Sequence, residues 1–208
     1  MKVTLENFPK VTSILRGYTV AEVDTILQVL CESKVNSVEI TCNTPGAVDI
    51  IRQSVAKYGD KLVIGAGTVT TMELLKEVID AGANFVLSPT VYTKEMLDYC
   101  KEHEVISVPG AYSPSEVQQQ FRLGADIVKI FPAITVGPIY FKQLAGPMGH
   151  QPLMAVGGVN AANAADFVAA GCDYLGIGSG MFQKEDATNN NVEALRQSVR
   201  DFEEALGL

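Results

Sequence analysis

Short apolar runs alternate with amphipathic stretches along the whole chain. The runs predict buried strands, and the stretches between them carry apolar residues three and four positions apart, as between residues 20 and 30, which predicts helices. We therefore expect eight strands, at residues 11–15, 35–41, 62–66, 84–88, 105–108, 126–131, 152–156 and 174–177.

Typical helix-start residues follow most of these runs. Thr19 is expected to cap the first helix, Pro45 to open the second, and residues 113–116 to begin the fifth. Further helices are expected from about Asn160 to Gly171 and from about residue 191 to residue 205. Each predicted strand is thus followed by a polar turn or a helix start.

A helix–glycine–strand phrase occurs three times, at residues 81–84, 123–126 and 170–173. In each phrase a glycine ends a helix directly before a strand, which indicates repeated βα units. Eight units in 208 residues leave about 26 residues each, enough for a strand, a helix and two short loops. We expect a single α/β domain over residues 1–208, folded as a compact (β/α)8 TIM barrel. The alternative is an open doubly wound sheet, but the turn at residues 16–18 is not the glycine-rich phosphate turn of that fold.

Composition narrows the function classes. The formal net charge is −8 and there is no basic stripe, so we expect neither nucleic acid nor an anionic membrane as a partner. No apolar segment is long enough to span a membrane, and the first ten residues lack a signal core. The four cysteines and two histidines are scattered, so we expect a cytoplasmic protein with no metal and no cofactor.

Lys129 lies inside the apolar run at residues 126–131. Burying a lysine is costly, and desolvation lowers the pKa of its ammonium group toward neutrality. The free amine can attack a ketone and form a Schiff base. The alternative is a strand-end lysine whose charged head reaches water over an apolar stem.

In a TIM barrel the carboxyl ends of the strands form the active-site rim. The residues expected at this rim are Arg16, Glu39, Thr41, Asn43, Gly65, Ala66, Gly67, Thr68, Ser88, Pro89, Pro109, Gly110, Lys129, Gly157, Gly158, Gly178, Ser179 and Gly180. Glu39 with Lys129 indicates acid–base chemistry beside a nucleophile, and a structural ion pair is the alternative. The glycines after the last two strands are expected to bind phosphate through backbone N–H groups at a helix start, with plain barrel turns as the alternative.

Several short motifs occur in an order and spacing that match one enzyme family: 38–41 (VEIT), 64–69 (IGAGTV), 87–89 (LSP), 108–110 (VPG), 128–133 (VKIFPA), 157–159 (GGV) and 178–179 (GS). The chain resembles, nearly from end to end, the bacterial 2-keto-3-deoxy-6-phosphogluconate (KDPG) and 4-hydroxy-2-oxoglutarate (KHG) aldolase family. The resemblance implies a metal-free class I aldolase that assembles as a homotrimer. It also implies that Lys129 forms the Schiff base, that Glu39 transfers protons and that Thr68 holds the pyruvate carboxylate.

Two departures from the family pattern concern the substrate. Asn43 stands where many members have an arginine that helps to hold the substrate carboxylate, and Arg16 could compensate. Val156 follows Ala155 where many members have Pro-Thr before the paired glycines, so a hydroxyl is lost, and Ile134 stands where an acidic residue is common.

The resemblance predicts cleavage of KDPG to pyruvate and glyceraldehyde 3-phosphate. The expected partners are therefore a small 2-keto acid and an aldehyde, with a phosphorylated substrate expected. One alternative is an aldolase for KHG or for another 2-keto-3-deoxy acid. A second is a phosphate-binding isomerase or synthase that uses Glu39 as a base and Lys129 as an electrostatic clamp. A third is a catalytically silent sugar-phosphate binding protein.

Overall fold

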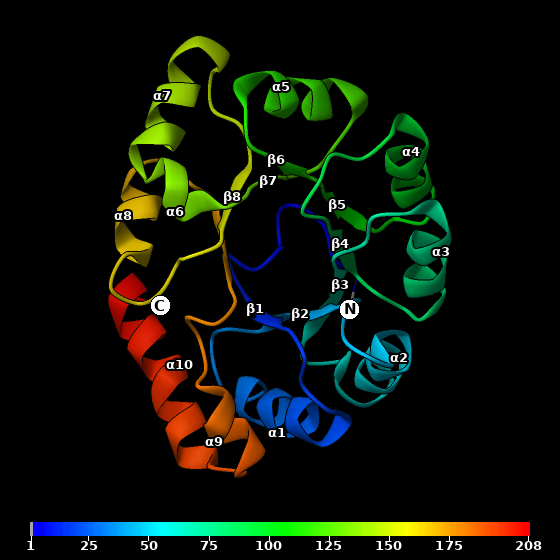
Figure 1. Cartoon of the computed structure of the whole chain (residues 1–208), viewed down its shortest axis with the longest axis vertical. Helices are drawn as coiled ribbons and strands as arrows, with labels where there is room; N and C mark the ends of the chain where they lie inside the picture. The colour runs from blue at the N-terminus through cyan, green and yellow to red at the C-terminus, as the bar shows by residue number, and fades with distance from the viewer. Residues whose placement is uncertain (1) are drawn as a thin grey trace.

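The computed structural model describes residues 2–208, and it confirms the predicted barrel (Figure 1). The strands form one sheet in the order β5-β4-β3-β2-β1-β9-β8-β7-β6, and all neighbouring strands are parallel. The strands are β1 (Val11–Leu15), β2 (Ser37–Thr41), β3 (Val63–Gly67), β4 (Phe85–Leu87), β5 (Ile106–Val108), β6 (Gly110–Ala111), β7 (Val128–Ile130), β8 (Leu153–Val156) and β9 (Tyr174–Ile177). Only Pro109 separates β5 from β6, so the two ends of the sheet meet in one interrupted strand.

Helices form the outer ring, with most of them in the loops between successive strands (Figure 1). They are α1 (Val20–Leu30), α2 (Ala47–Tyr58), α3 (Met72–Asp80), α4 (Lys94–Glu102), α5 (Pro114–Leu123), α6 (Ala133–Val136), α7 (Ile139–Met148), α8 (Ala164–Ala169), α9 (Lys184–Thr188) and α10 (Val192–Leu206). Thr19 and Ser113 begin α1 and α5 with complete capping boxes, as their sequence context predicts.

Two predicted helix starts are wrong. Pro45 lies before α2, because the Ala47 N–H donates to the Thr44 carbonyl and closes a turn first. Asn160 does not begin α8, because its side-chain Oδ1 accepts the Ala162 N–H at 2.9 Å and holds a local turn. Helices α6, α7 and α9 were not expected from the sequence.

The three helix–glycine–strand phrases have a common structure. The glycines Gly82, Gly124 and Gly171 have φ between 94° and 103°, the left-handed conformation that ends a helix. The last residue of each phrase then accepts a backbone N–H from the neighbouring strand: Asn84 from Ile64 at 3.0 Å, Asp126 from Ser107 at 2.9 Å and Asp173 from Leu153 at 3.2 Å. The repeat in the sequence therefore fixes where adjacent strands begin relative to one another.

A cluster of buried apolar side chains lies in the barrel interior. It consists of Val3, Phe8, Ile14, Val63, Phe85, Leu87, Ile106, Val108, Ile127, Met154 and Val156. Phe8 belongs to the N-terminal segment, which runs across the barrel in Figure 1, and its ring packs edge-on against Phe85 with the ring centroids 5.1 Å apart. This contact anchors the N-terminal segment to the barrel interior.

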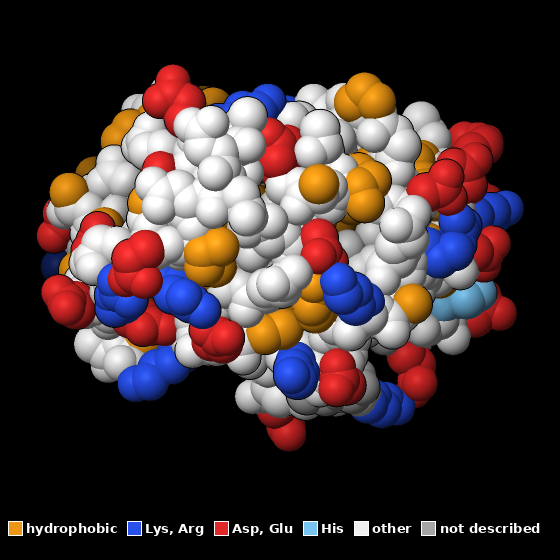
Figure 2. Space-filling view, turned by 90° about the horizontal axis from the view of Figure 1, so that it is seen from below, with side chains coloured by type: hydrophobic (Ala, Val, Ile, Leu, Met, Phe, Trp, Pro, Cys, Tyr) orange, Lys and Arg blue, Asp and Glu red, His pale blue; other side chains and the backbone are white. Residues whose placement is uncertain are grey.

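The outer surface carries acidic and basic side chains side by side rather than in separate fields, as Figure 2 shows for one face. No helix within residues 2–208 is long and apolar enough to cross a membrane.

Candidate active site

Glu39 and Lys129 both enter the barrel interior. Their strand neighbours Val38, Ile40, Val128 and Ile130 belong to the apolar layer between the strands and the helices, and side chains alternate along a strand. Glu39 is 1% exposed and Lys129 is 4% exposed, so the predicted burial of the lysine is confirmed. β2 and β7 thus direct a carboxyl group and an amine into the same enclosed space.

Burial governs the protonation of this pair. Desolvation raises the pKa of Glu39, and the nearby charges of Lys129 and Arg16 oppose that rise. Desolvation also lowers the pKa of Lys129, with the Glu39 carboxylate opposing the change and Arg16 adding to it. Both shifts favour neutral forms, so the site holds a more available free amine and a carboxyl group that exchanges its proton nearer to neutral pH.

Neither group is committed to a protein partner within the described part of the chain. The buried Oε2 of Glu39 has no hydrogen-bond partner, and Lys129 appears in no ion pair among residues 2–208. A structural ion pair would place the two groups in direct contact, so this geometry favours reactive groups over a structural pair.

Phe131 completes the surroundings of the amine. It occupies the next inward position after Lys129, and its ring centroid lies 5.0 Å from the Lys129 Nζ. Gly157 makes room for this ring, since a Cβ at that position would lie 3.2 Å from it. Phe131 is not among the residues predicted at the rim, although the period of two along the strand starting from Lys129 indicates it.

Arg16 lies at the mouth of the barrel directly after β1, and its side chain is exposed. The loop that carries it is held on both sides. Thr41 donates from Oγ1 to the Leu15 carbonyl at 3.2 Å, the Gly17 N–H donates to Thr44 Oγ1 at 2.8 Å, and Lys184 Nζ donates to the Gly17 carbonyl at 2.8 Å. Thr41, one of the predicted rim residues, is therefore engaged in fixing the Arg16 loop.

The loops after β3 and β4 contribute further predicted residues. Thr68 follows β3 with φ of 58°, which is a strained conformation for a β-branched residue and is typical of functional loops. Pro89 approaches β6 closely, because a Cβ at Gly110 would lie 2.5 Å from its carbonyl carbon. Asn43 lies after β2 and is exposed.

The glycine-rich loops after β8 and β9 lie side by side. Gly157 and Gly158 have φ of 94° and 77°, and a Cβ at Gly180 would lie 2.4 Å from the Val159 carbonyl oxygen. The expectation of a helix N-terminus here is wrong, because α8 begins only at Ala164. An anion bound here would therefore face the N–H groups of loop residues rather than those of a helix start. These residues are Gly157, Gly158 and Gly178, with the exposed Ser179 beside them.

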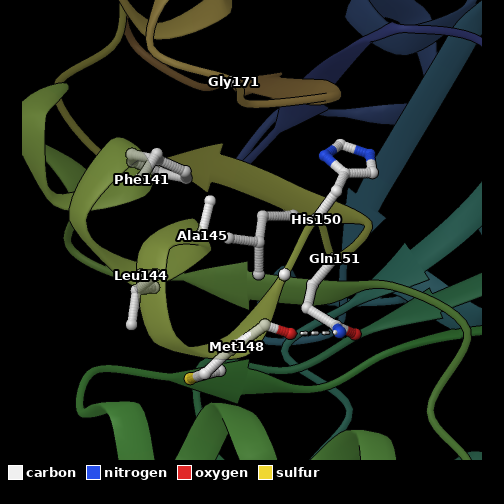
Figure 3. Close-up of a pocket in the computed structure, with 9 residues that line it drawn as sticks. Phe141, Leu144, Ala145, Met148, His150, Gln151 and Gly171 are labelled. Atoms are coloured by element: carbon white, nitrogen blue, oxygen red, sulfur yellow. Dashed lines mark hydrogen bonds between the residues drawn. The ribbon is translucent and has the colours of Figure 1, made fainter.

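The described residues suggest no metal site, and the enclosed cavity beside α7 is too small for a substrate. No group of three or more His, Cys, Asp and Glu residues suited to a metal occurs in residues 2–208. A cavity of about 10 Å³ lies between α7 and β8 (Figure 3), lined by Phe141, Leu144 and neighbouring residues. It is large enough for no more than about one water molecule, so it cannot hold a sugar acid.

Comparison with known proteins agrees with this geometry. The family described as "Aldolase: KDPG and KHG aldolase" matches residues 5–198. The 2-dehydro-3-deoxy-6-phosphogalactonate (KDPGal) aldolase of Escherichia coli K12 is 29% identical over 195 residues, which cover 93% of this chain and 95% of that protein. The KHG/KDPG aldolase of the same organism is 35% identical over 136 residues, covering 65% and 63%.

A solved structure shares the fold of this chain and contains a covalent intermediate of its own. The KDPG aldolase of Legionella pneumophila, with pyruvate captured as a covalent carbinolamine intermediate, superposes with a TM-score of 0.85 at 25% identity and covers 94% of each chain. Since the family match extends over nearly the whole barrel, this chain belongs to the KDPG and KHG aldolase family of carbon–carbon lyases.

Proposed function

We propose that this aldolase cleaves a 2-keto-3-deoxy-6-phosphohexonate to pyruvate and glyceraldehyde 3-phosphate through a Schiff base on Lys129, with KDPG as the first candidate substrate. The observation that carries the proposal is the buried pair of Lys129 and Glu39, neither of which forms an ion pair within residues 2–208. A lysine with a lowered pKa is the group that attacks a ketone at neutral pH.

In the proposed reaction the Lys129 amine attacks the C2 ketone and forms a carbinolamine. Loss of water gives an iminium ion, which accepts the electron pair when the C3–C4 bond breaks. Glu39 takes the proton from the C4 hydroxyl, so C4 becomes the carbonyl carbon of the aldehyde. The resulting enamine is protonated at C3, and hydrolysis releases pyruvate and the free amine. The carbinolamine captured in the Legionella pneumophila relative supports the first step.

We assign the remaining predicted residues to binding. Arg16 and Thr68 hold the carboxylate of the 2-keto acid, with Asn43 beside them at the mouth and Thr41 behind the Arg16 loop. Pro89 and Phe131 provide apolar walls that keep the amine desolvated. Gly157, Gly158, Gly178 and Ser179 bind the phosphate through loop N–H groups, a nest of the kind that binds anions without a lysine.

The galactonate epimer, KDPGal, is a second candidate substrate. The KDPGal aldolase of Escherichia coli K12 matches this chain over 93% of its length, and Val156 presents an apolar side chain to the barrel interior where many family members have a hydroxyl. The two epimers differ at C4 and yield the same products, because C4 loses its stereochemistry when it becomes a carbonyl carbon. The choice between them therefore depends on how the site contacts the C4 hydroxyl.

Two measurements test the proposal. Borohydride reduction in the presence of pyruvate should attach a stable adduct to Lys129, located by peptide mass mapping, whereas a phosphate-binding isomerase or synthase would give no adduct. Retro-aldol rates should then be compared for KDPG, KDPGal, unphosphorylated 2-keto-3-deoxygluconate and KHG. Faster cleavage of the unphosphorylated acid or of KHG would show that the glycine loops are not a phosphate site.

We also propose that the protein is a homotrimer, as the family resemblance implies. Large apolar side chains remain exposed directly after β6 and on helices α6 and α7: Tyr112 (47%), Ile134 (53%) and Ile139 (59%). The Tyr140 hydroxyl donates to the Tyr112 carbonyl at 2.7 Å, so these elements are neighbours. Light scattering of the purified protein should give three chains per particle, and Ile139→Glu should reduce that number.

A further inference from the structure

The positions of β3 that face the barrel interior beside Glu39 carry no side chains. Gly65 and Gly67 occupy successive inward positions of this strand, and they pair in register with Glu39 and Thr41 of β2. The two glycines therefore leave a gap in the barrel lining next to the residue proposed to transfer protons.

Glu39 occupies the gap at Gly67. A Cβ at Gly67 would lie 1.4 Å from Glu39 Oε1, 2.2 Å from Cδ and 2.7 Å from Cγ. Such distances are far inside contact range, so a methyl group and this carboxylate cannot share the space. The buried Oε2 has no hydrogen-bond partner in residues 2–208, so available space rather than a bond determines where the carboxylate lies.

Backbone geometry does not require a glycine at Gly67. Gly67 lies in a regular strand and its φ is not positive. Alanine is therefore compatible with its backbone conformation. Gly65 has a different neighbour, because a Cβ there would lie 2.5 Å from atoms of the rigid Phe85 ring in the apolar interior. The two glycines thus have separate roles in packing and in the site.

We propose that Gly67 is a positioning residue for the aldolase reaction, which holds the Glu39 carboxylate in reach of the substrate by leaving room for it beside β3. This inference rests on the proposed function. A methyl group at residue 67 would turn the carboxylate aside, because the end of a glutamate side chain moves more easily than the backbone. Lys129 would keep its place on β7, so the chain would still form the imine but would transfer protons slowly.

The test compares Gly67→Ala with Gly146→Ala, a matched change on α7 where an added Cβ meets no atom within 4 Å. We expect Gly67→Ala to lower kcat for KDPG cleavage by about 10²–10⁴-fold, the usual contribution of a positioned acid or base. The KM should change little, borohydride should still trap pyruvate on Lys129, and Gly146→Ala should behave as the wild type. Glu39→Asp, which is one methylene shorter, should cause a smaller fold-loss in the Gly67→Ala background than alone, because its carboxylate clears the added methyl group.

The possible results distinguish the positioning role of Gly67 from the proposed aldolase function. Wild-type kcat in Gly67→Ala, or equal losses from Glu39→Asp in both backgrounds, would overturn the positioning role and leave the aldolase assignment intact. Absence of trapping in the wild type would instead refute the proposed function. If Gly67→Ala does not fold, the double variant Glu39→Ala, Gly67→Ala decides, since it removes the carboxylate from the gap. Folding of this variant supports the proposal, and failure shows that the strand itself needs the glycine.

Discussion

Replacing Arg16 with methionine should separate two effects of its charge. Arg16 is exposed and forms no ion pair within residues 2–208, so the free energy of unfolding should change by no more than about 0.5 kcal/mol. Any loss of activity then belongs to the site. If Arg16 holds the substrate carboxylate, losing a charged hydrogen bond of about 1.5–3 kcal/mol should raise KM roughly 10- to 100-fold.

The second effect is on the amine. Arg16 lowers the pKa of Lys129, so its removal should raise that pKa and move the pH dependence of imine formation to higher pH. Because Arg16 is exposed, water and salt screen its charge, so we expect this rise to be larger at low ionic strength.

The assay is the initial rate of borohydride trapping with saturating pyruvate, measured from about pH 5 to pH 9. Arg16→Lys is the matched control, because lysine keeps the charge but loses the planar pair of donors. It should raise KM while leaving the pH midpoint in place. Identical midpoints for Arg16→Met and the wild type would refute the electrostatic reasoning, and an unchanged KM in Arg16→Met would remove Arg16 from the carboxylate site.

Four further predictions follow from the same geometry. Lys129→Ala should abolish both turnover and borohydride trapping while circular dichroism shows an intact fold, and an adduct on another lysine would contradict this. Glu39→Gln should slow retro-aldol turnover by about 10²–10⁴-fold while trapping persists, and wild-type kcat would make Glu39 structural. Activity should survive dialysis against EDTA, and recovery only on adding a divalent ion would exclude the class I mechanism. Asp126→Ala should lower the free energy of unfolding in urea by about 1–3 kcal/mol with kcat unchanged, since it leaves the Ser107 N–H without its acceptor.

Local sequence rules predicted the strands because apolar runs and turn signals alternate along the chain. The phrases ending at Asn84, Asp126 and Asp173 indicated three of the βα units, although their shared hydrogen bond to a preceding strand required the structure. Helices α6 and α7 were missed because glycine and proline interrupt residues 133–148. Pro147 lies inside α7 near its end. The helix forms nevertheless because it buries Phe141 and Leu144 in the core, so tertiary packing outweighs the low helix propensity of proline.

The features of the site also differ in whether local sequence rules or tertiary contacts determine them. Glu39 and Lys129 could be predicted because strand period and strand ends fix their side of the barrel. The gap at Gly67 could not, because it depends on where the Glu39 side chain crosses to β3. The engagement of Thr41 with the Arg16 loop also depends on a contact between residues 26 positions apart.

The barrel interior combines apolar packing with groups that are costly to bury. The Phe8 ring and its apolar neighbours stabilise the fold without any charged group. Three features within residues 2–208 cost free energy: the buried Glu39 Oε2 without a hydrogen-bond partner, the desolvated Lys129 and the strained Thr68. Burial of the apolar side chains offsets that cost, so the fold can hold these groups in the barrel. Gly67 belongs to the same arrangement, since it contributes no side chain to the packing and so leaves room for Glu39.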